Sequence, residues 1–190
     1  MLENAISNGK PSGSDFPVGA LATTPPRPVE RWYAISVRPR YEKLTTRHLE
    51  NQGVNCLLPV YRSVRRWKDR RKELDMALFP GYVFVNLNLR DRLGVLRAPG
   101  VLRFVAFQGQ PVAVPDSEIR ALESIMVAGL EPRPHPYLHK GTRVRVKRGP
   151  LADAEGIMVR RKNGFRLVLS IELIMQSAML EVDEADVEPL

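Results

Sequence analysis

The segment at residues 62–72 carries the side chains best suited to binding phosphate. It reads RSVRRWKDRRK, in which seven of eleven residues are Lys or Arg and Asp69 is the only acid. Cations bind phosphate oxygens, and the indole of Trp67 near the centre can stack on a base. We therefore predict a hairpin tip that reaches toward nucleic acid, with contacts from Arg65, Arg66, Trp67, Arg70 and Arg71. A solvated loop that only keeps the protein soluble is the alternative.

Side chains that could catalyse a reaction or hold a metal form no comparable pattern. His135 and His139 are four positions apart, but a proline lies between them and no pair of cysteines accompanies them. Cys56 is the only cysteine, and its place in a strand-like run favours a buried, inert thiol. Glycine-rich nucleotide-binding motifs are absent from the sequence. We expect a binding protein without metal or cofactor, and an enzyme that depends on His48 or Cys56 is a further alternative.

The positive charge is concentrated in the middle of the chain. The 190 residues carry a formal net charge of +8, and residues 31–128 alone hold 17 Lys and Arg against nine Asp and Glu. A basic domain suggests a polyanionic partner, although many basic domains are merely soluble. No run approaches the roughly 20 apolar residues of a membrane span, and a single free thiol fits the cytosol. We expect a monomeric cytoplasmic protein with no membrane partner.

Proline-rich stretches divide the chain into two domains. Residues 1–30 hold five prolines and no periodicity, which predicts a disordered leader. Residues 129–140 carry prolines at alternate positions and predict an extended, semi-rigid linker. The linker separates a domain at residues 31–128 from a smaller one at residues 141–190.

The sequence of the first domain predicts a sheet with one apolar face that its own helices leave uncovered. Its expected elements are strands at 32–37, 54–64, 82–87 and 101–107 and helices at 40–52, 90–97 and from 116 onward. This β-α-β-β-α-β-α order is the split βαβ pattern of ferredoxin-like domains, whose helices collect on one face. Yet residues 78–87, LFPGYVFVNL, are apolar at both parities, so both faces need a cover. A partner, the linker, the second domain or the core of the first domain could supply it.

The second domain predicts a small β-barrel. Short β-rich runs at 142–147, 155–161, 166–171 and 179–182 leave no room for helices, which suggests five strands. Asn163 and Gly164 form a strong two-residue hairpin signal. The chain as a whole is therefore expected to be α+β, with a ferredoxin-like domain followed by a barrel.

Two separated blocks resemble one known family. LFPGYVFV at 78–85 is similar to the N-terminal (NGN) domain of the NusG family of transcription elongation factors. GTRVRVKRGPLADAEGIMV at 141–159 is similar to the KOW motif of that family's C-terminal domain. RHLENQGVNCLLPV at 47–60 looks more like the specialised RfaH branch than like general NusG. The resemblance implies docking on the clamp helices of bacterial RNA polymerase, suppression of pausing, and a barrel that recruits the ribosome or a termination factor.

The resemblance also implies a docking surface, which the aromatic content supports. The positions that match the family's docking strand and its neighbours are Trp32, Phe79, Pro80, Tyr82, Phe84 and Val101. Aromatic side chains supply a large apolar contact area and lose little side-chain entropy on binding, because they have few rotamers. Val83 and Val85 have the opposite parity and should pack on the helices.

A second implied surface is basic. Arg38, His48 and Gln52 match positions that resemble RfaH contacts to the non-template DNA strand, and Arg40 and Arg47 lie nearby. An ordinary solvated helix face is the equal alternative.

Four departures from RfaH or general NusG alter the expected partners. Leu44 and Pro99 stand where RfaH has DNA-reading arginines, so a different DNA sequence, or none, is read. Residues 91–94 replace a His and Thr run that meets the far side of the polymerase cleft. SIELIM at 170–175 lacks the aromatic that general NusG offers to partners, which puts ribosome or termination-factor binding in doubt.

Two interpretations of function remain, with an expectation about the barrel. A transcription elongation or antitermination factor is the first, and a KOW-containing RNA-binding ribosomal or ribosome-assembly protein is the second. The C-terminal domain of RfaH can fold as a helical hairpin over the docking face, and the run at 165–180 of this chain is rich in Leu, Ile and Met, several of them good helix formers. Strand alternation at 142–148 outweighs that run. We therefore expect a β-barrel tethered clear of Tyr82 and Phe84.

Overall fold

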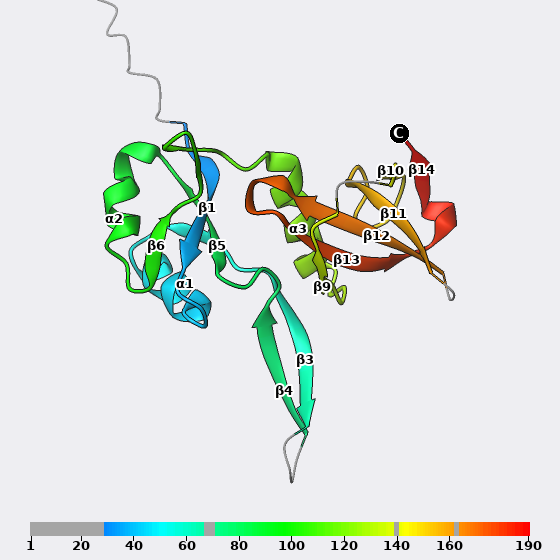
Figure 1. Ribbon diagram of the computed structural model, residues 1–190, viewed down its shortest axis with the longest axis horizontal. Coiled ribbons are helices and arrows are strands. Elements are labelled where there is room, and N and C mark those ends of the chain that lie inside the picture. Colours follow the sequence, from blue (N-terminus) through cyan, green and yellow to red (C-terminus); the bar gives the residue numbers. More distant parts are fainter. Residues whose placement is uncertain (1–28, 67–70, 139–140, 162–163) are drawn as a thin grey trace, which may run out of the picture.

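The computed structural model describes residues 29–66, 71–138, 141–161 and 164–190. Two β-rich halves lie side by side with one helix, α3 (Asp116–Val127), between them (Figure 1). Strands outnumber helices throughout the described residues, so the chain has a mixed fold of helices and strands. The expected leader at 1–30 falls almost wholly outside the described residues.

The N-terminal half is built on a four-stranded antiparallel sheet. Its strands are β1 (Arg31–Val37), β2 (Asn55–Leu57), β5 (Tyr82–Leu87) and β6 (Val101–Phe104), in the order β2-β5-β1-β6. β1 and β5 are central, as their β-branched and aromatic residues favour. Successive side chains along each strand therefore point to opposite faces of the sheet, and each face is covered by different elements.

Two helices cover one face of this sheet. Leu49 of α1 (Glu42–Asn51) and Val95 of α2 (Arg92–Leu96) pack in one cluster with Val83 and Val85, as expected from parity. The sequence places Tyr41, Leu44, Thr45, His48 and Gln52 on one stripe of the expected helix, and the buried stripe of α1 differs from it. The buried residues are Glu42, Thr45, Thr46 and Leu49, whereas Leu44 is 52% exposed.

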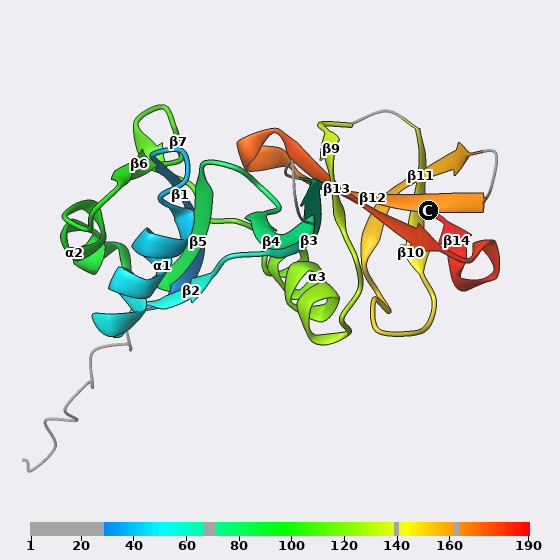
Figure 2. The same cartoon turned by 90° about the horizontal axis from the view of Figure 1, so that it is seen from below.

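The third helix corrects the expectation that all helices share a face. Ile119, Leu122 and Ile125 of α3 are buried in a cluster with Ala34 and Phe84, which lie on the sheet face away from α1 and α2. Figure 2 shows α3 between the two halves. The spacing of its apolar residues predicted a buried stripe correctly but could not say which surface the stripe would meet.

A long hairpin projects from the N-terminal half (Figure 1). It consists of β3 (Val60–Arg66) and β4 (Arg71–Ala77), paired along their whole length from Val60–Ala77 to Arg66–Arg71. Smaller elements follow: a 3₁₀ turn η1 (Leu89–Asp91) and a short hairpin of β7 (Ala106–Phe107) and β8 (Gln110–Pro111).

The C-terminal half is a six-stranded sheet in the order β14-β10-β11-β12-β13-β9. The strands of the expected second domain are β10 (Thr142–Val146), β11 (Glu155–Arg161), β12 (Gly164–Ile171), β13 (Gln176–Val182) and β14 (Val187–Pro189). Two 3₁₀ turns, η2 (Glu172–Ile174) and η3 (Glu184–Asp186), connect the last three. β11 and β12 are joined at Arg161 and Gly164 where the hairpin was expected, although Asn163 lies outside the described residues.

The sixth strand comes from the proline-rich linker. β9 (Arg133–Pro136) pairs with β13, so the linker is extended as expected but joins the sheet instead of acting as a free tether. Prolines at alternate positions suit an edge strand, since only every second residue must donate to the partner. Leu138 is held as well, because its carbonyl accepts from Ser170 Oγ at 2.8 Å and its N–H donates to Ser177 Oγ at 3.2 Å.

Candidate functional site

The Phe79–Gly81 corner sets the start of strand β5. Gly81 has a φ of 84°, a left-handed conformation that favours glycine. Its N–H donates to the Glu42 carboxylate at 2.8 Å, and its carbonyl accepts from Val37 N at 2.9 Å. Helix α1 thereby fixes the corner from which the aromatic residues of β5 extend.

Loss of the Glu42 contact should be measurable. Glu42→Ala is expected to lower the free energy of unfolding by about 1–3 kcal/mol, because the Gly81 N–H would lose its acceptor in a nearly buried place. Urea unfolding of the full chain measures it. Glu50→Ala, an exposed acid of the same helix, is the matched control and should change stability little. Equal effects of the two substitutions would contradict the anchoring role.

An aromatic surface, here called the Trp32 face, comprises Trp32, Ala34, Tyr82, Phe84 and Phe79. The first four share one side of paired strands, since Ala34 lies opposite Phe84 and the partners of Trp32 and Tyr82 are Asn86 and Ser36. Phe79 packs edge-on against Phe84, with ring centroids 5.9 Å apart. Phe79 and Phe84 are buried, Trp32 and Tyr82 are half-buried, and Pro80 is exposed. The structure therefore brings together four of the six positions matched to the docking strand and its neighbours, and the exposed Pro80 follows Phe79 in the chain.

Val101 is the exception. It packs against the cluster beneath α1 and α2, with Val37 and Phe104, and not against the Trp32 face. A register shift between Ser36 and Val37 in the pairing of β1 with β6 changes the parity at this point. A bulge of this kind leaves no clear mark in the sequence, and a docking role of Val101 stays a prediction.

The Trp32 face is covered within the chain, which corrects the expectation of a barrel clear of Tyr82 and Phe84. One continuous cluster joins Ala34 and Phe84 to α3 and to buried residues of the C-terminal sheet, Ile174 of η2 among them. Figures 1 and 2 both show the β12–β13 turn on the side of the sheet opposite α1 and α2. The expected β structure of residues 142–182 is present, so the cover is a strand-rich half and not a helical hairpin.

The start of α3 is tied to the Trp32 face. Val114 N donates to the Trp32 carbonyl at 2.8 Å, and Ala113 bridges to Tyr33. Helix α3 therefore leaves directly from the edge of β1 and reaches the C-terminal sheet within a few residues. Any ligand that needs Phe84 must first displace this cover.

The predicted basic surface is solvent-facing. Arg38, Arg40 and Arg47 are exposed, and Gln52 Nε2 lies 3.1 Å from His48 Nε2 on one stripe of α1. Arg40 adopts a φ of 68°, unusual for a residue with a side chain, as the chain turns into α1. These residues all lie on the N-terminal half, Arg38, Arg40, Arg47 and Gln52 exposed and His48 half-buried, and their contact with nucleic acid stays a prediction.

The cationic hairpin is partly described. Backbone pairing places Arg65 and Arg66 on β3 opposite Lys72 and Arg71 on β4, near the tip. Trp67 and Arg70 lie outside the described residues. The hairpin of β3 and β4 projects from the N-terminal half (Figure 1), and contact of its cations with nucleic acid stays a prediction.

Cys56 is poorly suited to nucleophilic chemistry. Burial, with a smaller contribution from Glu50, raises the pKa of its thiol to about 12, and its Sγ lies 3.5 Å from the Val54 carbonyl. A thiol in this state is protonated near neutral pH. Within the described residues, no group of three or more His, Cys, Asp or Glu side chains could hold a metal ion. No helix in the same part of the chain is long and apolar enough to cross a membrane.

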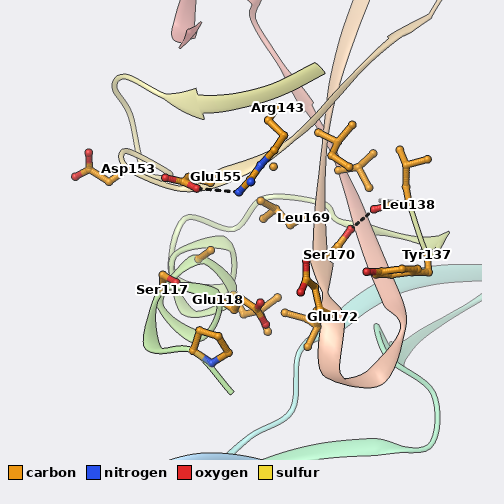
Figure 3. Close-up of a pocket in the computed structure, with 17 residues that line it drawn as sticks. Ser117, Glu118, Tyr137, Leu138, Arg143, Asp153, Glu155, Leu169, Ser170 and Glu172 are labelled. Carbon is orange, nitrogen blue, oxygen red and sulfur yellow. Dashed lines mark hydrogen bonds and ion pairs between the residues drawn. The ribbon is translucent and has the colours of Figure 1, made fainter. Parts of the chain in front are cut away.

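The sequence did not single out two acids, Glu118 on α3 and Glu172 on η2. They face each other beside a cavity between α3 and the C-terminal sheet (Figure 3). The only sequence signal of Glu118 was its place in the first turn of a predicted helix, which is common for an acid, and Glu172 had none. Nothing in the sequence linked position 118 to position 172.

Comparisons with known proteins agree with the fold and the motifs. A family model described as "Transcription termination factor nusG" matches residues 30–123. The Escherichia coli K12 protein named "Transcription termination/antitermination protein NusG" is 25% identical over 175 residues, covering 85% of this chain and 97% of its own. The Vibrio parahaemolyticus protein of the same name is 27% identical over 177 residues, covering 86% and 97%.

A solved structure shows the same fold. The structure titled "Domain interaction in Thermotoga maritima NusG" matches with a TM-score of 0.52 at 24% identity, covering 85% of this chain and 97% of that one. The named relatives are transcription factors, and their matches span both the aromatic and the barrel motifs. The chain therefore belongs to the NusG family of transcription termination and antitermination factors.

Proposed function

We propose that this chain docks on bacterial RNA polymerase through the Trp32 face and suppresses pausing or termination during elongation in the cytoplasm. The observation that carries the proposal is the face itself: aromatic side chains gathered on two central strands, on the side that α1 and α2 leave open. Such a set has the composition of an interface centre. The clamp helices of the polymerase are the partner that the family resemblance implies.

The proposal also divides the chain into two domains. We assign residues 31–128 to an NGN-type, ferredoxin-like domain and residues 141–190 to a KOW barrel. The pairing of β9 with β13 supports placing the boundary before Arg133, so that part of the 129–140 linker belongs to the barrel. α3 then spans the junction between them.

Docking requires opening of the chain. Phe79 and Phe84 are buried and the cluster over them includes α3 and η2, so the polymerase would replace the C-terminal half on the same surface. The open chain would also free the β12–β13 turn, where Ile174 is buried. That turn is the place at which a ribosome or termination factor would bind, by the family resemblance, although SIELIM offers no aromatic there.

The proposal is tested by capture from a bacterial lysate followed by a pausing assay. The full chain should capture RNA polymerase and not ribosomal subunits, and the purified chain should shorten pauses of the captured enzyme. Salt-sensitive capture of ribosomal RNA without polymerase would contradict the proposal and favour the ribosomal alternative. The named relatives do not favour that alternative.

We also propose that the cationic hairpin and the basic patch of Arg38, Arg40, Arg47, His48 and Gln52 contact non-template DNA or upstream nucleic acid. Replacing Arg65, Arg66, Arg70 and Arg71 with glutamine should weaken binding to an elongation complex and flatten its salt dependence, by up to about one unit of slope per lost phosphate contact. Affinities measured over a series of salt concentrations give the slope. Arg90→Gln and Arg97→Gln, exposed cations away from the hairpin, are the control. An unchanged slope would make the hairpin a solvated surface only.

A further inference from the structure

The junction of the two halves contains a cavity of about 390 Å³. Helix α3 forms one wall through Glu118, Ala121 and Leu122, and the C-terminal sheet forms the other through Leu169 and Ile171. Glu118 and Glu172 approach from opposite sides (Figure 3). The cavity therefore brings together two acids of different halves, of which Glu118 is half-buried and Glu172 is exposed.

Glu118 is not compensated there. Its Oε2 is buried and has no hydrogen-bond partner among the described residues. Burial first, and then the charge of Glu172, raises the pKa of Glu118 from 4.5 to about 7. The closed arrangement thus disfavours the ionised form of this side chain.

The other charged groups that line the cavity do not stabilise the ionised form of Glu118. Asp153, Glu155 and the Tyr137 ring line the sheet side of the cavity. Glu155 is paired with Arg145 at 2.7 Å and with Arg143 at 3.4 Å, so the guanidinium of Arg143, which also lines the cavity, is directed to Glu155. Among these charged groups it is Glu172 that acts on Glu118, and it favours the neutral form.

We propose that closure of the two halves is coupled to a proton on Glu118, whose neutral form stabilises the closed chain and whose ionised form favours opening. Opening hydrates the carboxylate and separates it from Glu172. The neutral carboxyl removes a buried charge and supplies an O–H donor inside the cavity.

The direction of the pH effect follows from the raised pKa. The closed chain binds the proton more tightly than an open chain with the ordinary value of 4.5, so this contribution to closure is complete below pH 4.5. It falls by about tenfold in the closing equilibrium per pH unit above that value, and it is lost as pH passes about 7. The coupling needs no polymerase, so it can fail or hold independently of the proposed docking.

The test measures closure in the chain alone. Dyes on Arg92→Cys in α2 and Lys147→Cys after β10, with Cys56 replaced by serine, report the distance between the halves by energy transfer. Transfer should fall as pH rises from about 5 to about 8 in the parent chain. Glu118→Gln should keep high transfer throughout. Glu123→Gln, an exposed acid on the same helix, is the matched control and should behave like the parent.

If energy transfer shows that the chain stays closed at every pH, the free energy of unfolding is measured instead. The difference in free energy of unfolding between Glu118→Gln and the parent should then grow as pH rises from about 5 to about 7, because only the parent loses its proton. Glu172→Gln should reduce the pH dependence without abolishing it, since burial remains. A pH-independent difference, or a Glu118→Gln chain that opens like the parent, would overturn the coupling.

Discussion

Phe84→Ala is expected to lower the free energy of unfolding of the full chain by about 3–5 kcal/mol. The side chain is 0% exposed, it packs edge-on against Phe79, and it sits where the sheet, α3 and the C-terminal half form one cluster. Its removal leaves a cavity that three rigid elements cannot close. Urea unfolding measures the change, and Leu102→Ala, an exposed apolar residue on the edge strand β6, is the control.

Tyr82→Ala separates docking from stability on the same strand. Tyr82 is half-buried, so its loss should cost less stability than loss of Phe84. If the Trp32 face meets the polymerase, the same substitution should weaken capture by about 2–4 kcal/mol, as for an interface hot spot. A folded Tyr82→Ala chain with parental polymerase affinity would contradict docking through this face. A stability loss from Phe84→Ala no larger than that from Leu102→Ala would contradict the shared core.

Patterns within single elements predicted the N-terminal sheet well. Residues 82–87 are apolar at both parities, and the structure covers both sides of β5 with separate clusters. Gly53, which directly follows the helix expected at 40–52 and is the residue type that commonly ends a helix, adopts a left-handed φ of 81°. These features depend on residues close in sequence, which is why a sequence reveals them.

Features that depend on distant residues could not be predicted. The apolar stripe of α3 shows that it is buried, but nothing in it distinguishes the α1 side of the sheet from the opposite side. The same holds for Val101, whose parity changes at a bulge, and for Glu118, whose partner is 54 positions away. The open question of what covers the Trp32 face had the same origin, since a barrel of strands can be tethered or docked without any change in its own periodicity.

The conformation of the linker was predicted, but its pairing with β13 was not. Alternate prolines at 132, 134 and 136 indicated an extended segment, which β9 is. The same spacing also leaves every second N–H free to pair, and Arg133 and His135 lie opposite Met179 and Ser177. An extended proline-rich segment beside a small barrel is therefore also a candidate edge strand, which composition alone does not suggest.

Locking the two halves together should abolish capture of RNA polymerase. Glu118→Cys with Glu172→Cys places thiols on opposite sides of the cavity, to be joined by a cleavable bifunctional maleimide (Figure 3). Because Val114 fastens the start of α3 to Trp32 at 2.8 Å, this bridge holds the C-terminal half beside the Trp32 face. Binding scales with the fraction of open chain, so the bridged protein should bind at least about tenfold more weakly.

The design separates the bridge from the substitutions. Cys56 is replaced by serine in every variant, although burial already raises the pKa of its thiol to about 12 and makes it slow to react. The unbridged double variant is the reference for the bridge: it keeps Trp32 and Tyr82 and should still bind, although less tightly than the parent, because two neutral thiols remove the repulsion between Glu118 and Glu172 that favours opening. Cleavage of the spacer should restore its binding, and a monofunctional maleimide should not reduce it. Full polymerase binding by the bridged chain would mean that the halves need not separate, and that the polymerase meets a surface other than the one buried between them.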